Sequence, residues 1–218
     1  MNEGPDREFE QGDAFAVLRQ FSKRRRRSGL EHCELCSAEL EEIHSHLLEP
    51  TTRQIMCACE GCSMVFCGQE GARYKRIPRQ VRLLSGFEMT DLQWEALMLP
   101  INLAFFYRES ASEKVRAMYP SPAGSMESLL SLESWGEIVA QNRPLQGMEA
   151  DVEALLVNRV GAPFEYYTVP IDECYRLVGL IRSQWKGLSG GNDVWAGIQG
   201  FFTDLKAKRI GDRKVVNA

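Results

Sequence analysis

Side chains that commonly bind metal ions are concentrated in one short stretch of the chain. Residues 32–67 contain six of the seven cysteines and all three histidines of the 218 residues. In a reducing compartment, a cysteine cluster of this kind is typical of metal binding rather than of disulfides. A stretch this short buries little apolar surface, so we expect it to need a metal ion or a neighbouring protein to stay folded.

Two Cys-x-x-Cys pairs form the centre of this stretch. Cys33 and Cys36 make the first pair, Cys59 and Cys62 make the second, and 22 residues separate the two. Each pair can direct both thiolates at one ion, and two such turns complete a tetrahedral four-sulfur site. We predict one zinc ion as the cofactor, with one iron ion as the alternative, because four thiolates suit both metals.

Further residues of ligand type lie close to the pairs. Cys57 precedes Cys59 by two residues and His44 precedes His46 by two, so in extended strands the members of each couple point to the same side. Cys57 and His46 are therefore alternates for one of the four ligands. Cys67 lies in an apolar run and is predicted to pack rather than to bind metal.

The sequence pattern divides the chain into four parts and predicts an α+β protein. The parts are an N-terminal helix with a basic linker (1–29), a zinc-ribbon or rubredoxin-like metal unit (30–80), an α+β domain (81–210) and a tail (211–218). In the metal unit we expect strands at 43–49, 52–57 and 64–67.

The predicted α+β domain alternates strand pairs with helices. Such an order indicates an antiparallel sheet covered on one side by helices. Strand pairs are expected at 101–107 with 114–119 and at 152–157 with 164–169, and a rigid loop is expected at 120–124. Helices are expected after the capping box Thr90-x-x-Gln93, over 134–141, from the cap Asp172 and over 194–205.

Composition and motifs exclude several classes of function. The sequence has no phosphate-binding glycine loop, nucleophile elbow or His-Glu-x-x-His motif, so we expect no enzymatic activity. The net charge is -4, which argues against nucleic-acid binding despite the basic run Arg24–Arg27. The longest apolar stretch, 97–107, is too short to span a membrane, and the N-terminus lacks a secretory signal. We expect a cytoplasmic protein.

Several motifs together resemble one bacterial family of unassigned function. The genes of that family lie in clusters that encode uptake nickel–iron hydrogenases, so the resemblance implies a pathway and no particular activity. Cys67 is not part of the family pattern. The motifs follow one order from about Cys33 to Leu205 and are Cys33-x-Leu35-Cys36, His44-x-His46-Leu47-Leu48-Glu49, Cys57-Ala58-Cys59-x-x-Cys62, Tyr119–Gly124, Asp151–Val157 and Val169–Arg182.

Three functions fit these features. The leading hypothesis is a non-catalytic metal-binding accessory protein that assists assembly or maturation of the hydrogenase by contacting a hydrogenase subunit or a maturation factor. The alternative is a rubredoxin-like electron carrier with one iron on four cysteines, although residues 59–63 lack the Cys-Pro-x-Cys-Gly sequence common in rubredoxins. The third is a zinc ribbon that binds nucleic acid with help from Arg24–Arg27, for which affinity would fall steeply with salt.

Overall fold

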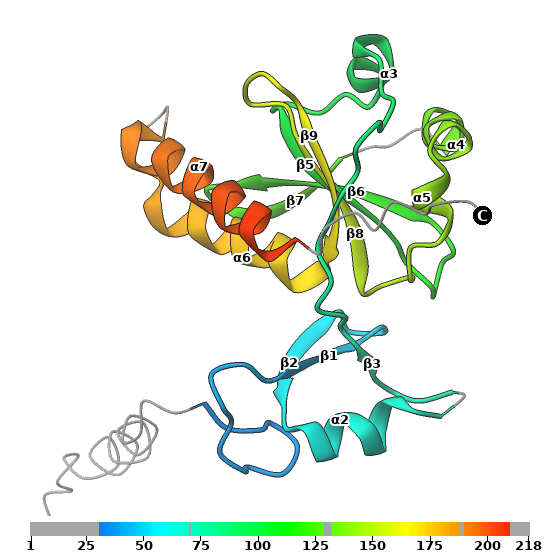
Figure 1. Ribbon diagram of the computed structural model, residues 1–218, viewed down its shortest axis with the longest axis vertical. Helices are drawn as coiled ribbons and strands as arrows, with labels where there is room; N and C mark the ends of the chain where they lie inside the picture. The colour runs from blue at the N-terminus through cyan, green and yellow to red at the C-terminus, as the bar shows by residue number, and fades with distance from the viewer. Residues whose placement is uncertain (1–30, 70, 129–131, 188–189, 210–218) are drawn as a thin grey trace, which may run out of the picture.

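The computed structural model describes residues 31–69, 71–128, 132–187 and 190–209. In these ranges the chain forms two antiparallel sheets accompanied by helices (Figure 1), which confirms the predicted α+β class. The predicted N-terminal helix, the run Arg24–Arg27 and the tail lie outside the described residues. Among the residues described, no helix has both the length and the apolarity that a membrane crossing requires.

The smaller sheet has three strands in the order β2–β1–β3 and lies in the lower part of Figure 1. The first two strands confirm the predictions at 43–49 and 52–57. The bounds are β1 (Ser45–Glu49), β2 (Gln54–Ala58) and β3 (Lys75–Arg76).

Residues 64–67, predicted as a third strand, belong instead to helix α2 (Glu60–Cys67). The helix forms because the Cys59 sulfur accepts a hydrogen bond from the Cys62 N–H at 3.4 Å and so caps the first turn. The Ser63 N–H donates to the Cys59 carbonyl at 2.9 Å, which continues the helical pattern. The second cysteine pair is thus the first turn of a helix.

The larger sheet has six antiparallel strands in the order β4–β9–β8–β5–β6–β7. Its pairs β5–β6 and β8–β9 are the two pairs expected from the sequence. The rigid loop predicted at 120–124 is instead a tight hairpin: only residues 122–123 connect β6 to β7, with Ser121 opposite Gly124. The bounds are β4 (Arg82–Leu83), β5 (Leu103–Arg108), β6 (Val115–Ser121), β7 (Gly124–Ser128), β8 (Glu153–Asn158) and β9 (Glu165–Pro170).

Helices cover both faces of this sheet (Figure 1), so the prediction of a sheet covered on one side was wrong. Neighbouring residues of a strand point to opposite faces. Phe105 and Leu156 therefore pack with α6 and α7, whereas Phe106 and Leu155 pack with the region of α3 to α5. The bounds are α3 (Asp91–Ala96), α4 (Leu132–Gln141), α5 (Arg143–Gln146), α6 (Ile171–Gln184) and α7 (Gly191–Lys208).

The smaller sheet contributes to two separate cores. Leu48 belongs to the core that contains α6 and α7, and Ile77 joins it there. Leu47, the adjacent residue of β1, packs instead with Met56 and Cys33 in a small core beside the cysteines. This alternation means that one face of the small sheet rests on the larger unit and the other faces the cysteine-containing turns.

The start of α3 confirms the predicted capping box. The Gln93 N–H donates to the Thr90 hydroxyl at 3.2 Å, and the Thr90 N–H donates to the Gln93 side chain at 2.9 Å. We expect Thr90→Ala to lower the free energy of unfolding by about 1 kcal/mol and Thr90→Ser to leave it nearly unchanged. Urea denaturation followed by circular dichroism measures the difference, and equal midpoints for the two variants would contradict it.

Candidate metal centre

The structure brings the two predicted cysteine pairs together. The ligand atoms of Cys33, Cys36, Cys59 and Cys62 all lie within 4.8 Å of one another, and the Cys36 and Cys59 sulfurs are 3.7 Å apart. A tetrahedral site with metal–sulfur bonds of about 2.3 Å requires sulfur separations of about 3.8 Å. The donor set and its spacing therefore fit a single bound metal ion.

Two hydrogen bonds hold the first cysteine turn against strand β2. The Glu34 N–H donates to the Cys57 carbonyl at 2.9 Å, and the Cys57 N–H donates to the Glu34 carboxylate at 2.9 Å. The turn closes through the Ser37 N–H, which donates to the Cys33 carbonyl at 2.8 Å, with Ser37 in the left-handed region at φ 63°. These contacts place Cys33 and Cys36 next to the start of α2.

An ionic contact anchors the second cysteine turn. The Glu60 carboxylate accepts hydrogen bonds from the Ser45 hydroxyl at 3.0 Å and from the Arg76 guanidinium at 2.8 Å. The Ser45 hydrogen bond, with Arg76 beside it, lowers the pKa of Glu60. Because Ser45 lies on β1 and Arg76 on β3, the first turn of α2 is tied to two strands of the small sheet.

The thiols of Cys33 and Cys62 differ in how readily they ionise. Burial opposes ionisation of Cys33, but backbone N–H groups of Cys59, Cys36 and Leu35 outweigh it and lower the pKa of the Cys33 thiol to about 6. Burial and the neighbouring thiols raise the pKa of Cys62. Four thiolates in such proximity repel one another, and a divalent cation at their centre removes that obstacle. The cluster could therefore bind a metal ion as a set of thiolates.

The two predicted alternates do not join this cluster. Cys57 and His46 form a second group with His44, and one ligand atom of each lies within 4.8 Å of the others. Cys57 lies in β2 whereas Cys59 caps a helix, so the two residues serve different groups although only one residue separates them. Cys67 is half-buried and belongs to neither group.

Sequence reasoning missed one side chain beside the second group. The Asp172 carboxylate lies 2.6 Å from Nδ1 of His46, and this hydrogen bond raises the pKa of His46. Asp172 was predicted to cap a helix, but α6 begins at Ile171 with Pro170 as its cap. Because 126 residues separate Asp172 from His46, no local pattern in the sequence could have connected them.

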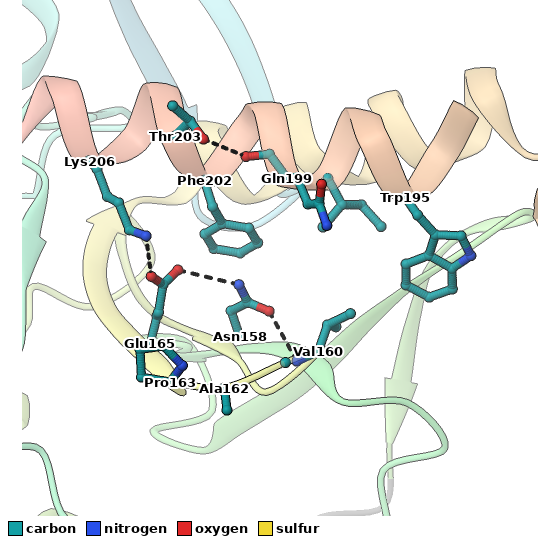
Figure 2. Close-up of a pocket in the computed structure, with 12 residues that line it drawn as sticks. Asn158, Val160, Ala162, Pro163, Glu165, Trp195, Gln199, Phe202, Thr203 and Lys206 are labelled. Atoms are coloured by element: carbon teal, nitrogen blue, oxygen red, sulfur yellow. Dashed lines mark hydrogen bonds and ion pairs between the residues drawn. The ribbon is translucent and has the colours of Figure 1, made fainter. Parts of the chain in front are cut away.

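A hollow of about 400 Å³ lies away from the cysteines, between α7 and the connection of β8 to β9. Figure 2 shows Trp195 at one end and the ion pair of Glu165 with Lys206 at the other. Trp195 is 42% exposed, so it lies at the surface of α7 rather than in the core. The residues that line the hollow include no cysteine or histidine, and the candidate metal centre is separate from it.

Comparison with known proteins identifies the family of the chain. Residues 32–209 match a family of unknown function, DUF5947. No curated protein and no solved structure gives a significant match. The matched residues include both cysteine pairs, the second group and the whole of the larger sheet with its helices. The chain therefore belongs to the family of unknown function DUF5947.

Proposed function

We propose that this protein is a non-catalytic, metal-binding accessory protein that assists assembly or maturation of an uptake nickel–iron hydrogenase through protein–protein contacts. The observation that carries the proposal is the position of the cysteine cluster directly at the start of α2, whose outer face is apolar. An ion bound to Cys59 and Cys62 would hold that helix in place. The hydrogenase pathway rests on the motif resemblance described above.

The apolar face of α2 has the character of a contact surface. Met64, Val65 and Phe66 are 63%, 64% and 44% exposed, and together they cover the side of α2 opposite the buried Ser63. Exposed apolar residues gathered in one place are typical of surfaces that bind another protein. We name these three residues the α2 patch.

Zinc is the metal that suits this role best. A site closed by four thiolates leaves no position open for a substrate, and such sites are typical of structural zinc. Zinc carries no redox chemistry, so its contribution would be to fix the cysteine turns and the α2 patch. Metal analysis of protein purified without added metal tests this assignment, with zinc and no iron expected.

Deleting the gene in a bacterium that carries it beside a hydrogenase cluster tests the pathway. Hydrogen uptake is expected to fall, and wild-type protein and Cys67→Ser are expected to restore it. Cys36→Ser should not restore it, because one of the four thiolates is lost. Undiminished hydrogen uptake in the deletion strain would refute the accessory role.

The α2 patch yields a prediction about binding. Phe66→Ser is expected to weaken binding to the partner hydrogenase subunit or maturation factor roughly tenfold, as loss of a central apolar contact does. Leu92→Ser is the matched control, because Leu92 is an exposed apolar residue on α3 in the larger unit. Isothermal titration calorimetry with the purified partner measures both variants, and equal affinities would show that the patch is not the contact surface.

The alternative function is a rubredoxin-like electron carrier. It is favoured by the exposure of Cys36 and by the N–H donor of Cys62 at the Cys59 sulfur, because exposure and such hydrogen bonds tune iron–thiolate centres. An iron protein of this kind is red as isolated and loses its colour with dithionite. Colourless protein that contains zinc would exclude this alternative.

A further inference from the structure

The second group of ligand-type residues is built by the register of the small sheet. His46 in β1 lies opposite Cys57 in β2, so their side chains are neighbours on the same face. His44 precedes His46 by two residues and extends the same side of the chain. One ring nitrogen of each histidine and the Cys57 sulfur lie within 4.8 Å of one another.

Each imidazole of the group uses Nδ1 in a hydrogen bond. Its other nitrogen, Nε2, is therefore available to bind an ion. Nδ1 of His44 lies 2.9 Å from the Glu41 carbonyl, and Nδ1 of His46 lies 2.6 Å from the Asp172 carboxylate. Carbonyl and carboxylate oxygens accept hydrogen bonds, so each Nδ1 is the donor and each Nε2 keeps its lone pair. A carboxylate behind a histidine in this way is the usual outer partner of a metal-bound imidazole.

The inner nitrogen of His44 has no hydrogen-bond partner among the described residues. The His44 side chain is only 7% exposed, and its Nε2 is buried without a hydrogen bond. A buried polar atom in this state is unfavourable and calls for an explanation. The Glu31 carboxylate lies 3.4 Å from the same nitrogen. With the proton on Nδ1 of His44, its Nε2 and the Glu31 carboxylate oxygen both offer electron pairs. A cation between these two atoms would satisfy both.

A pocket with acidic residues in its wall lies beside one member of the second group, His44. A pocket of about 410 Å³ runs alongside His44 and is lined by the carboxylates of Glu39, Glu41 and Glu60 together with Arg79. Acidic side chains at its wall raise the local concentration of cations.

We propose that His44, His46 and Cys57 form a second metal site, separate from the four-cysteine cluster, that binds a divalent ion of borderline softness such as Zn²⁺. Two imidazole nitrogens and one thiolate are a typical donor set for such an ion, and Glu31 is placed to supply a fourth ligand. Asp172 is a positioning residue that orients His46. Because Asp172 lies on α6, the ion would link the small sheet to the larger unit. The site does not depend on the accessory role proposed above.

Cobalt titration of the full chain, stripped of metal under reducing conditions, tests the site. We expect two Co²⁺ ions per chain with different spectra. The ion on four cysteines gives the strong thiolate-to-cobalt absorption, and the second ion gives a weaker band because it has one sulfur ligand. Zn²⁺ should displace both. One ion per chain in the wild-type protein at excess Co²⁺ would overturn the proposal.

Variants connect the second ion to these residues. Cys57→Ala should bind one ion per chain and keep the strong four-thiolate spectrum, which also reports that the small sheet remains folded. Asp172→Asn should weaken binding of the second ion 10–100-fold without changing the first. Cys67→Ala, a thiol outside both groups, should retain two ions.

The wild-type protein decides the question if Cys57→Ala fails to fold. X-ray absorption at two bound ions per chain should then show nitrogen ligands in addition to sulfur. Sulfur ligands alone, or two ions retained in a folded Cys57→Ala variant, would contradict the site.

Discussion

Cys33→Ser is expected to unfold the small sheet while the six-stranded sheet stays folded. In the part of the chain that the structure describes, the core beside the cysteines has five buried apolar residues, namely Cys33, Leu40, Leu47, Met56 and Ala58. So small a core cannot offset the entropy of ordering its chain, and metal binding to a structural site supplies roughly 10–16 kcal/mol of folding free energy. Losing one of the four ligands removes much of this folding free energy.

Hydrogen exchange followed by mass spectrometry measures this effect segment by segment. Amides of β1 and β2 should lose protection by several orders of magnitude, whereas those of β5 and β8 should keep theirs. Cys67→Ser is the matched control, since it removes a half-buried thiol from the same unit without touching either ligand group. Full protection of β1 and β2 in metal-free protein would mean that packing alone holds the small sheet.

Asp151→Ala is expected to lower the free energy of unfolding by about 3 kcal/mol. The Asp151 side chain is 4% exposed and lies 2.7 Å from the Lys75 ammonium, while the Ser110 N–H donates to it at 2.8 Å. Removing one partner leaves the other charge largely buried and unpaired, which costs more than the pair contributes. Lys75 lies in β3 and Asp151 just before β8, so the loss loosens the junction of the two sheets.

Two further variants separate the charge from the hydrogen bonds. Asp151→Asn tolerates the left-handed backbone at φ 73° and can still accept from Ser110, so it should be less destabilised than the alanine variant. Lys75→Met removes the charge and leaves Asp151 bonded to Ser110. A double-mutant cycle in urea yields the coupling energy of the pair, and a value near zero would contradict its role.

Because of the Asp151 carboxylate, we expect the stability of the protein to depend on pH. Burial opposes ionisation of Asp151, but Lys75 and Ser110 outweigh it and lower its pKa. The stabilisation is then complete above the pKa of an unfolded aspartate, about 3.9, and is lost as the pH falls through the lower pKa of the folded state. Below about pH 4, stability should fall more steeply for the wild type than for Asp151→Asn, as urea denaturation at several pH values would show.

The cysteine cluster was predictable because its chemistry is local. Each pair carries its own spacing, and the hairpin between the pairs brings the two turns together. The strand predicted at 64–67 failed because four consecutive apolar residues have no period that separates strand from helix. The cap formed by Cys59 makes this segment helical, whereas the sequence analysis considered that residue only as a ligand.

The sequence contained evidence against another wrong prediction, that of a sheet covered by helices on one side only. The run Leu103 to Tyr107 is apolar at every position, and all five residues are buried. An unbroken apolar strand is typical of a sheet covered on both faces, whereas alternation indicates one covered face. By contrast, the contact of His46 with Asp172 depends on how α6 packs against the small sheet. Only the assembled fold contains that information.

The connection between β1 and β2 sets a strict limit on changes in chain length. It spans residues 50–53, with Arg53 at φ 59°, and fixes His46 opposite Cys57. A single inserted residue would slide one strand against the other and exchange the faces of every side chain beyond it. Met56 would then stand where Cys57 does, and Cys59 would be displaced from its partners. The length of this short hairpin fixes the positions of both ligand groups, so an insertion there would abolish the two together.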